Sequence, residues 1–143
     1  MFIFVVCGSA IVVMLGIAHA IFTVQSSPIA GPLTPTDDRV KTAMTVRGGL
    51  GMAPGIDTTL WRAWTGFNLS HSLGVVVIGA MVGVRALVDF DDALADPLYV
   101  SIAIATPLIY LVISVRYWFR SPTIGISLAT ALILIGIIGG VAF

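Results

Sequence analysis

The chain is poor in charged residues, and this shortage excludes most classes of protein. Of its 143 residues only 10% are charged, with seven Lys and Arg balanced by seven Asp and Glu. Soluble domains have about 25% charged and about 45–50% apolar residues, whereas this chain is 58% hydrophobic with a mean hydropathy of +1.08. Without a basic excess, nucleic acid is not an expected partner. The composition predicts a small integral membrane protein.

Cysteine and histidine are also scarce. The single Cys7 cannot form a disulfide within the chain, and we interpret it as a small buried apolar side chain. The only two histidines, His19 and His71, lie in apolar segments that contain no carboxylate, which is too few ligands for zinc. No set of nucleophile, base and acid is found either. We therefore expect neither a zinc site nor an enzyme.

Four long apolar segments make up most of the chain. They cover residues 2–24, 60–88, 97–119 and 123–143. A helix needs roughly 20 residues to cross a hydrocarbon core of about 30 Å, so each segment is long enough. Their continuous apolar runs lack the alternation of a membrane β-barrel. The sequence predicts an all-α, integral membrane four-helix bundle that forms a single domain over residues 1–143.

A long loop, residues 25–59, joins the first two predicted spans. After a start rich in Ser and Pro, Thr36 is expected to cap a short surface helix over about 37–46. The glycine-rich stretch 48–55 does not fit a phosphate-binding loop and is interpreted as a connector. We expect Asp57 or Thr58 to cap the second span.

The charges are divided unequally between the two sides of the predicted bundle. Six of the seven basic side chains belong to the first and third loops or their flanks: Arg39, Lys41, Arg47, Arg62, Arg116 and Arg120. The second loop has only Arg85, near four aspartates. By the positive-inside rule, loops one and three are expected in the cytoplasm and both termini outside.

Small residues in the spans predict close helix packing. Gly79 and Gly83 are four residues apart, as are Gly136 and Gly140, and this spacing lets two helix backbones approach. The pattern does not distinguish packing within the bundle from packing between subunits. Pro107 is expected to kink the third span and to free the carbonyl of Ala103.

Polar side chains within the spans gather in the half that faces the cytoplasm. At 1.5 Å per residue, His19 and His71 lie roughly 8 and 10 Å from that surface. Trp64, Asn68 and His71 share one helix face because they are spaced at i, i+4 and i+7. The candidate site residues are His19, Trp64, Asn68, His71, Tyr110 and Ser114.

Three interpretations of this polar layer remain open. The side chains can satisfy one another and fix the helix register. They can bind the polar head of an apolar molecule, such as a quinone, a sterol-like lipid or a fatty acyl group. His19 and His71, at similar depth on two helices, can also be the axial ligands of a b-type haem.

One segment carries a family resemblance. Within residues 60–74 the residues that carry it are Trp61, Trp64, Gly66, Phe67, Asn68, Ser70, His71, Ser72, Leu73 and Gly74. Together with Gly16 and His19, they resemble small bacterial four-helix membrane proteins similar in outline to the DoxX-like group. This resemblance implies a four-span bundle in the bacterial inner membrane, and it suggests that Asn68 and His71 act together. It implies no specific activity.

The leading functional hypothesis is a structural or accessory subunit of a larger membrane complex, such as a respiratory or photosynthetic one. Its expected partners are membrane lipids and either other membrane subunits or further copies of the chain. A binding module for a quinone or lipid and a haem-carrying electron-transfer subunit are the alternatives.

Overall fold

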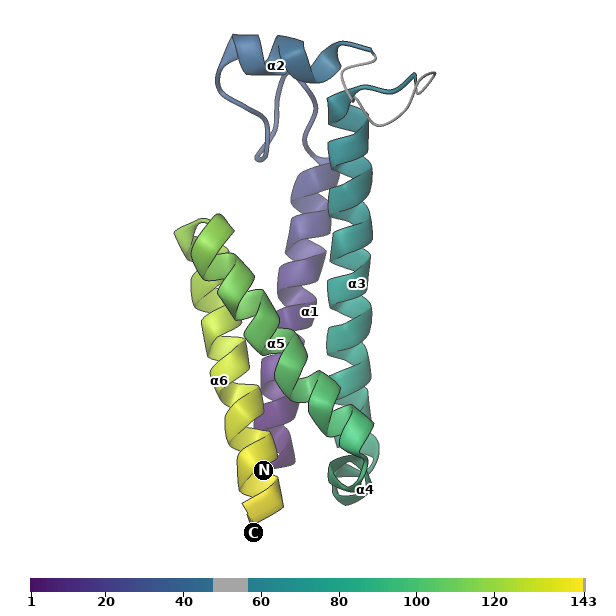
Figure 1. Cartoon of the computed structure of the whole chain (residues 1–143), viewed down its shortest axis with the longest axis vertical. Helices are drawn as coiled ribbons and strands as arrows, with labels where there is room; N and C mark the ends of the chain where they lie inside the picture. Colours follow the sequence, from purple (N-terminus) through teal and green to yellow (C-terminus); the bar gives the residue numbers. More distant parts are fainter. Residues whose placement is uncertain (48–56, 143) are drawn as a thin grey trace. The chain divides into compact units, whose positions relative to one another are not determined.

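The computed structural model describes residues 1–47 and 57–142 (Figure 1). The described residues form six helices: α1 (Phe2–Val24), α2 (Asp38–Thr45), α3 (Leu60–Val88), α4 (Phe90–Ala95), α5 (Pro97–Tyr117) and α6 (Arg120–Ala142). Four of these, α1, α3, α5 and α6, are long and apolar enough to cross a membrane. The predicted all-α fold with four long apolar helices is confirmed.

The predicted bounds of the last two spans need correction. Helix α5 ends at Tyr117 instead of residue 119, because Trp118 adopts an extended backbone and donates its N–H to the carbonyl of Ser114. Helix α6 begins at Arg120 instead of residue 123. Pro122 is tolerated there because the first turn of a helix needs no N–H from it.

The cap predicted for the short surface helix was also wrong. Asp37, and not Thr36, is the N-cap of α2, and its carboxylate accepts the N–H of Arg39 at 2.7 Å. One turn further on, the Lys41 ammonium donates to Asp38 at 2.9 Å. This hydrogen bond, reinforced by the charge of Lys41, holds the pKa of Asp38 below its ordinary value.

The start of α3 is likewise capped by a residue that we did not predict. Thr59 accepts the N–H of Arg62 at 3.1 Å, whereas Asp57 forms an ion pair with Arg47 at 2.6 Å. Arg47 and Thr59 also form an isolated antiparallel bridge. The predicted glycine-rich connector, 48–55, lies outside the described residues.

Helix α4 occupies what we expected to be the loop between the second and third spans. Asp89 is its N-cap and accepts the N–H of Asp92 at 3.0 Å. Asp96 then caps α5 by accepting the N–H of Leu98 at 2.9 Å. Arg85, at the end of α3, forms an ion pair with Asp92. The cluster of aspartates is therefore explained in part by two consecutive helix caps.

The chain forms two compact units. Unit 1 consists of Met1–Leu15 and Val75–Phe143, and thus contains the first part of α1, the last part of α3 and the whole of α4, α5 and α6. Unit 2 is Gly16–Gly74, with the remainder of α1 and α3 together with α2.

Glycines bring the helices of unit 1 into close contact. A Cβ built on Gly136 would lie 2.9 Å from the backbone nitrogen of Val5, so α6 and α1 meet almost backbone to backbone. A Cβ on Gly83 would lie 3.0 Å from the Cβ of Ser9, which brings α3 equally close to α1. The predicted glycine pairs therefore pack within the chain.

The buried core of unit 1 surrounds these contacts and includes residues from α1, α3, α4, α5 and α6: Val5, Val82, Ala86, Ala93, Tyr99, Ala103, Ile133 and Ile137. Two hydroxyls connect helices across it. Tyr99 donates to the carbonyl of Val82 at 3.1 Å, and Thr130 reaches the carbonyl of Pro107 at 3.2 Å. Hydrogen bonds of this kind give the hydroxyls the partner that a hydrocarbon environment would not supply.

Cys7 is not the buried side chain that we predicted, because it lies on an exposed face of α1. The buried positions of this stretch are Val5, Gly8 and Ser9, which share the opposite face. Successive residues of a helix are rotated by about 100°, so Cys7 points away from the face that Val5, Gly8 and Ser9 share.

Helix α5 separates an acidic end of unit 1 from a basic end. The aspartates of α4 and its caps precede it, and Arg116 and Arg120 lie at its other end. Its 21 residues span roughly 31 Å at 1.5 Å per residue, which matches the thickness of a hydrocarbon core. The charge distribution of unit 1 is thus compatible with a membrane crossing.

We predict that Gly136→Ala destabilises the protein by about 1–3 kcal/mol, because the added methyl group meets backbone atoms of α1 that cannot move aside. Gly66→Ala is the matched control, since its Cβ would meet nothing within 4 Å. Thermal unfolding in mild detergent measures both variants. Equal melting temperatures for the two variants would contradict this account of the packing.

Candidate functional site

The candidate site lies in unit 2, where the end of α1 and the beginning of α3 run side by side (Figure 1). The His19 ring, on α1, meets the Asn68 side chain, on α3, with 2.8 Å between Nε2 and Oδ1. Both side chains are partly buried. This hydrogen bond joins two of the polar residues that the sequence placed at one depth.

The amide of Asn68 decides which nitrogen of His19 carries the hydrogen. Its Nδ2 donates to the carbonyl of Trp64 at 2.7 Å, so its Oδ1 is the atom that faces the imidazole. A carbonyl oxygen can only accept, so His19 Nε2 must be the donor. In the neutral ring the lone pair then lies on Nδ1.

Two hydroxyls hold the backbone around this pair. Thr23 donates to the carbonyl of His19, and Ser72 donates to the carbonyl of Asn68. The donor–acceptor distance is 2.8 Å in both bonds. Thr23 is fully buried and Ser72 is 1% exposed. Because each hydroxyl bonds to its own helix one turn back, it is satisfied without a second partner.

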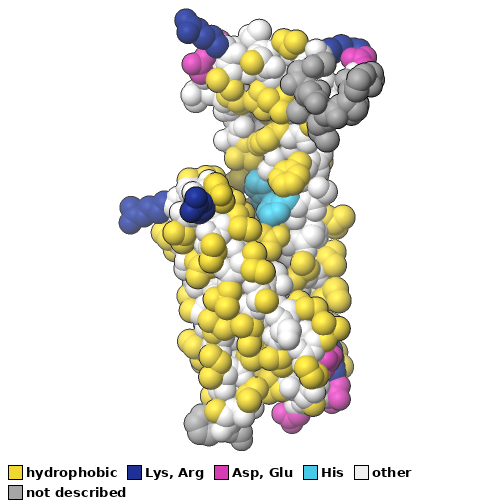
Figure 2. Space-filling view, viewed as in Figure 1, with side chains coloured by type: hydrophobic (Ala, Val, Ile, Leu, Met, Phe, Trp, Pro, Cys, Tyr) yellow, Lys and Arg dark blue, Asp and Glu magenta, His cyan; other side chains and the backbone are white. Residues whose placement is uncertain are grey.

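His71 continues the cluster toward the surface of the unit. Its ring centroid lies 5.8 Å from that of His19, with the two rings nearly perpendicular. The ring of Phe67 is almost parallel to His71, at 6.3 Å, and Phe67 is 69% exposed. Histidine side chains are visible on the face drawn in Figure 2, with hydrophobic side chains around them. The cluster therefore has a buried side at Asn68 and an accessible side at Phe67.

Trp64 takes part through its backbone, since its carbonyl positions Asn68. Its ring instead packs against Trp61, with 5.0 Å between centroids, and Trp61 is 8% exposed. Trp64 thus orients the site through its backbone carbonyl.

The other two predicted site residues belong to unit 1. Ser114 is fully buried, donates to the carbonyl of Leu111 at 2.8 Å and accepts at its own carbonyl from Thr123. The ring of Tyr110 lies 6.2 Å from that of Trp118. Both residues stabilise the connection between α5 and α6.

The predicted b-type haem stays a prediction. In this arrangement His19 would have to ligate through Nδ1, since its Nε2 holds the hydrogen that it donates to Asn68. The ring of His71, the other predicted ligand, is stacked on Phe67. Among residues 1–47 and 57–142 no group of three or more His, Cys, Asp or Glu could hold a metal ion.

Sequence reasoning missed two residues, one in the cluster and one in unit 1. Phe67 appeared only in the family resemblance, although its spacing of four from His71 predicts a shared helix face. Ser9 was overlooked altogether, yet its hydroxyl in an apolar span should have prompted a search for its partner.

Comparison of the chain with models of protein families, with curated proteins and with solved structures finds no match. The resemblance to the DoxX-like group therefore stays a prediction that depends on the residues quoted for it.

We predict that His19 and Asn68 are energetically coupled. Asn68→Ala removes the acceptor of the His19 N–H, so replacing His19 as well should cost little more. A double-mutant cycle of unfolding free energies should give a coupling of about 0.6 kcal/mol, with roughly 1.7 kcal/mol as the upper end for membrane proteins. Ser70→Ala combined with His19→Ala is the control, because Ser70 bonds only to the Phe67 carbonyl. Strictly additive effects for His19 and Asn68 would contradict the assignment.

Proposed function

We propose that the protein is a structural or accessory subunit of a larger membrane complex, and that it docks laterally through the first half of α3. The observation that carries this proposal is an open face of small residues. A Cβ added at Gly66 or at Gly74 would meet nothing within 4 Å. Ser70, midway between them, is exposed.

The second half of the same helix shows how a face of small residues packs against a neighbouring helix. Gly79 and Gly83 also repeat at four residues, and a Cβ on either would come within about 3.0 Å of α1 side chains. One glycine pair of α3 is thus filled by a neighbouring helix, whereas the Gly66–Ser70–Gly74 stretch is not. In a bilayer, faces of this kind favour helix association because backbones can approach closely.

The rim of this face indicates the chemistry of the partner. Phe67 is 69% exposed and Leu73 is 64% exposed, and both border the small residues. No charged residue occurs between Arg62 and Arg85. An apolar transmembrane helix from another subunit is the occupant that suits such a surface.

The proposal includes a location and an orientation. The division of basic residues favours loops one and three on the cytoplasmic side and both termini outside. The family resemblance adds the bacterial inner membrane as the compartment.

The test introduces bulk at the open face. We expect Gly66→Leu combined with Gly74→Leu to lower recovery of one co-purifying membrane protein about tenfold, a loss of ~1.4 kcal/mol. The melting temperature of this double variant should equal that of the unaltered protein, because a side chain at either position has free space. Ala105→Leu, at an exposed position of α5, is the matched control.

Extraction of native membranes into polymer-bounded nanodiscs, followed by mass spectrometry, provides the measurement. A photo-crosslinker at position 70 should label the same partner. A protein that is monomeric, or that pairs only with itself, would contradict the accessory role.

A second candidate function is supported by the accessible side of the His19–Asn68–His71 cluster. There a partly buried imidazole lies parallel to an exposed phenyl ring, 6.3 Å away. An imidazole can hydrogen-bond a carbonyl or hydroxyl, while the ring beside it contacts an apolar tail. We propose a quinone or a lipid headgroup as the ligand class.

His71→Ala should reduce the amount of one specifically retained lipid or quinone severalfold, because it removes both the polar contact and the stacked ring. The measurement is organic extraction of the purified protein and mass spectrometry, normalised to total phospholipid. Ser70→Ala is the control, since its hydroxyl is exposed and bonds within α3. Unchanged retention in His71→Ala would leave the cluster with a packing role only.

A further inference from the structure

Two arginines of unit 1 have no carboxylate partner. Arg116 is in the last turn of α5 and Arg120 is the first residue of α6, and both are exposed. The seven acidic residues of the chain are all aspartates, and all lie in the part that the structure describes. Their ion pairs are with Lys41, Arg47 and Arg85. Arg116 and Arg120 therefore keep their positive charges without an aspartate beside them.

The aspartates of unit 1 are too distant to compensate these charges. The last of them, Asp96, is the N-cap of α5, whereas Arg116 lies near the other end of the same helix. At 1.5 Å per residue, the two are separated by roughly 30 Å along the helix. Figure 2 shows Lys or Arg side chains at this end of α5 and α6, with no Asp or Glu beside them on the face that it draws.

The guanidinium group of Arg116 is oriented by the next residue. Its Nε donates to the hydroxyl oxygen of Tyr117 at 3.2 Å, and its Cζ lies 5.7 Å from the centroid of the Tyr117 ring. Within the described residues its two terminal nitrogens make no hydrogen bond. A guanidinium with free terminal N–H groups presents a planar fork that suits two oxygens of a phosphate group.

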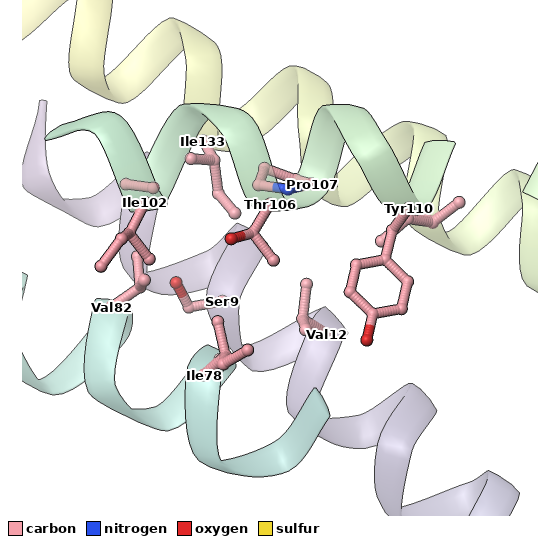
Figure 3. A pocket seen from close by; sticks show the side chains of 12 residues that line it. Ser9, Val12, Ile78, Val82, Ile102, Thr106, Pro107, Tyr110 and Ile133 are labelled. Atoms are coloured by element: carbon pink, nitrogen blue, oxygen red, sulfur yellow. The ribbon is translucent and has the colours of Figure 1, made fainter. Parts of the chain in front are cut away.

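Aromatic side chains accompany the two arginines. Tyr117 is 73% exposed and Phe119 is 67% exposed, whereas Trp118, between them, packs against Tyr110 with 6.2 Å between ring centroids. Tyr110 in turn borders a cavity of about 20 Å³ inside unit 1 (Figure 3). The connection between α5 and α6 is thus anchored through Trp118 and presents two aromatic rings outward, as is typical of residues at a membrane interface.

We propose that the connection between α5 and α6 binds the headgroup of an anionic phospholipid. The phosphate oxygens accept hydrogen bonds from Arg116 and Arg120, and the rings of Tyr117 and Phe119 contact the glycerol and the first methylenes of the acyl chains. An anionic headgroup is preferred to a zwitterionic one, because the ammonium of the latter would add a positive charge beside two that are unpaired.

This site is independent of the functions proposed above. The open face of α3 between Gly66 and Gly74 belongs to unit 2, and so does the cluster around His71. The two arginines and the two exposed rings belong to unit 1. A lipid is favoured over a free anion because the site lies at the end of two helices that are long and apolar enough to cross a membrane.

The selectivity of the unaltered protein tests the proposal without any variant. Native mass spectrometry of the full chain in mild detergent, titrated with phosphatidylglycerol or with phosphatidylcholine of identical acyl chains, gives two dissociation constants. We expect phosphatidylglycerol to bind about 25-fold more tightly, because each arginine near an anionic lipid contributes about fivefold. Equal dissociation constants overturn the proposal.

A double variant locates the site. Arg116→Gln combined with Arg120→Gln should weaken the binding of phosphatidylglycerol about 25-fold and leave that of phosphatidylcholine unchanged. Lys41→Gln combined with Arg47→Gln is the matched control, because it removes the same net charge from side chains that are paired with aspartates. Its dissociation constant for phosphatidylglycerol should stay close to that of the unaltered protein. An equal loss in both double variants overturns the proposal, since net charge alone would then attract the lipid.

Inorganic phosphate separates a lipid site from a site for a free anion. Added at the same concentration as phosphatidylglycerol, it should leave most of the bound lipid in place, because it offers the aromatic rings nothing to contact. Complete displacement at equal concentration would identify free phosphate as the occupant and overturns the proposal.

Discussion

In a hydrocarbon environment every polar group must find its partner inside the protein, and the structure depends on this constraint. Thr23, Ser72 and Thr130 bond to carbonyls one turn back in their own helices. His19 donates to the Asn68 oxygen between helices, and the Asn68 amide nitrogen donates to the carbonyl of Trp64. A functional interpretation is most useful where a polar group lacks a hydrogen-bond partner within the chain, or where a helix face has no neighbouring helix.

Close packing is the second determinant, and glycine supplies it on α1, α3 and α6. Where Gly136 meets Val5 and where Gly83 meets Ser9, a single methyl group would disturb the contact. The same residue type at Gly66 and Gly74 faces open space. Composition alone cannot tell these two situations apart, because both have small residues at helical spacing.

Hydropathy was sufficient to predict the spans, and the bounds of α1 and α3 agree with the structure at both ends. It failed where short-range hydrogen bonding decides the structure. Asp89 and Asp96 turn an acidic linker into α4 and the cap of α5, and Trp118 ends α5 earlier than its apolar residues suggest. Cys7 was misplaced because residue type alone does not say which face of a helix is buried.

For the site, the sequence identified His19, Asn68 and His71 because polar residues in apolar spans are conspicuous. It could not predict the direction of the hydrogen bond to His19, which depends on how the Asn68 amide is turned by the Trp64 carbonyl. Nor could it predict that Ser114 donates to the carbonyl of Leu111, or that the ring of Tyr110 lies near that of Trp118.

The division of the chain into units has a consequence for biosynthesis. Unit 2, Gly16–Gly74, is one continuous stretch, so all of its residues are present before α5 has been translated. Unit 1 combines the first 15 residues with the last 69, and its contact between Val5 and Gly136 closes only when α6 is made. Because synthesis proceeds at about 5–20 residues per second, the beginning of α1 waits several seconds for its final neighbour. During that interval, Val5 and Gly8 lack the α6 residues that cover them in the folded chain.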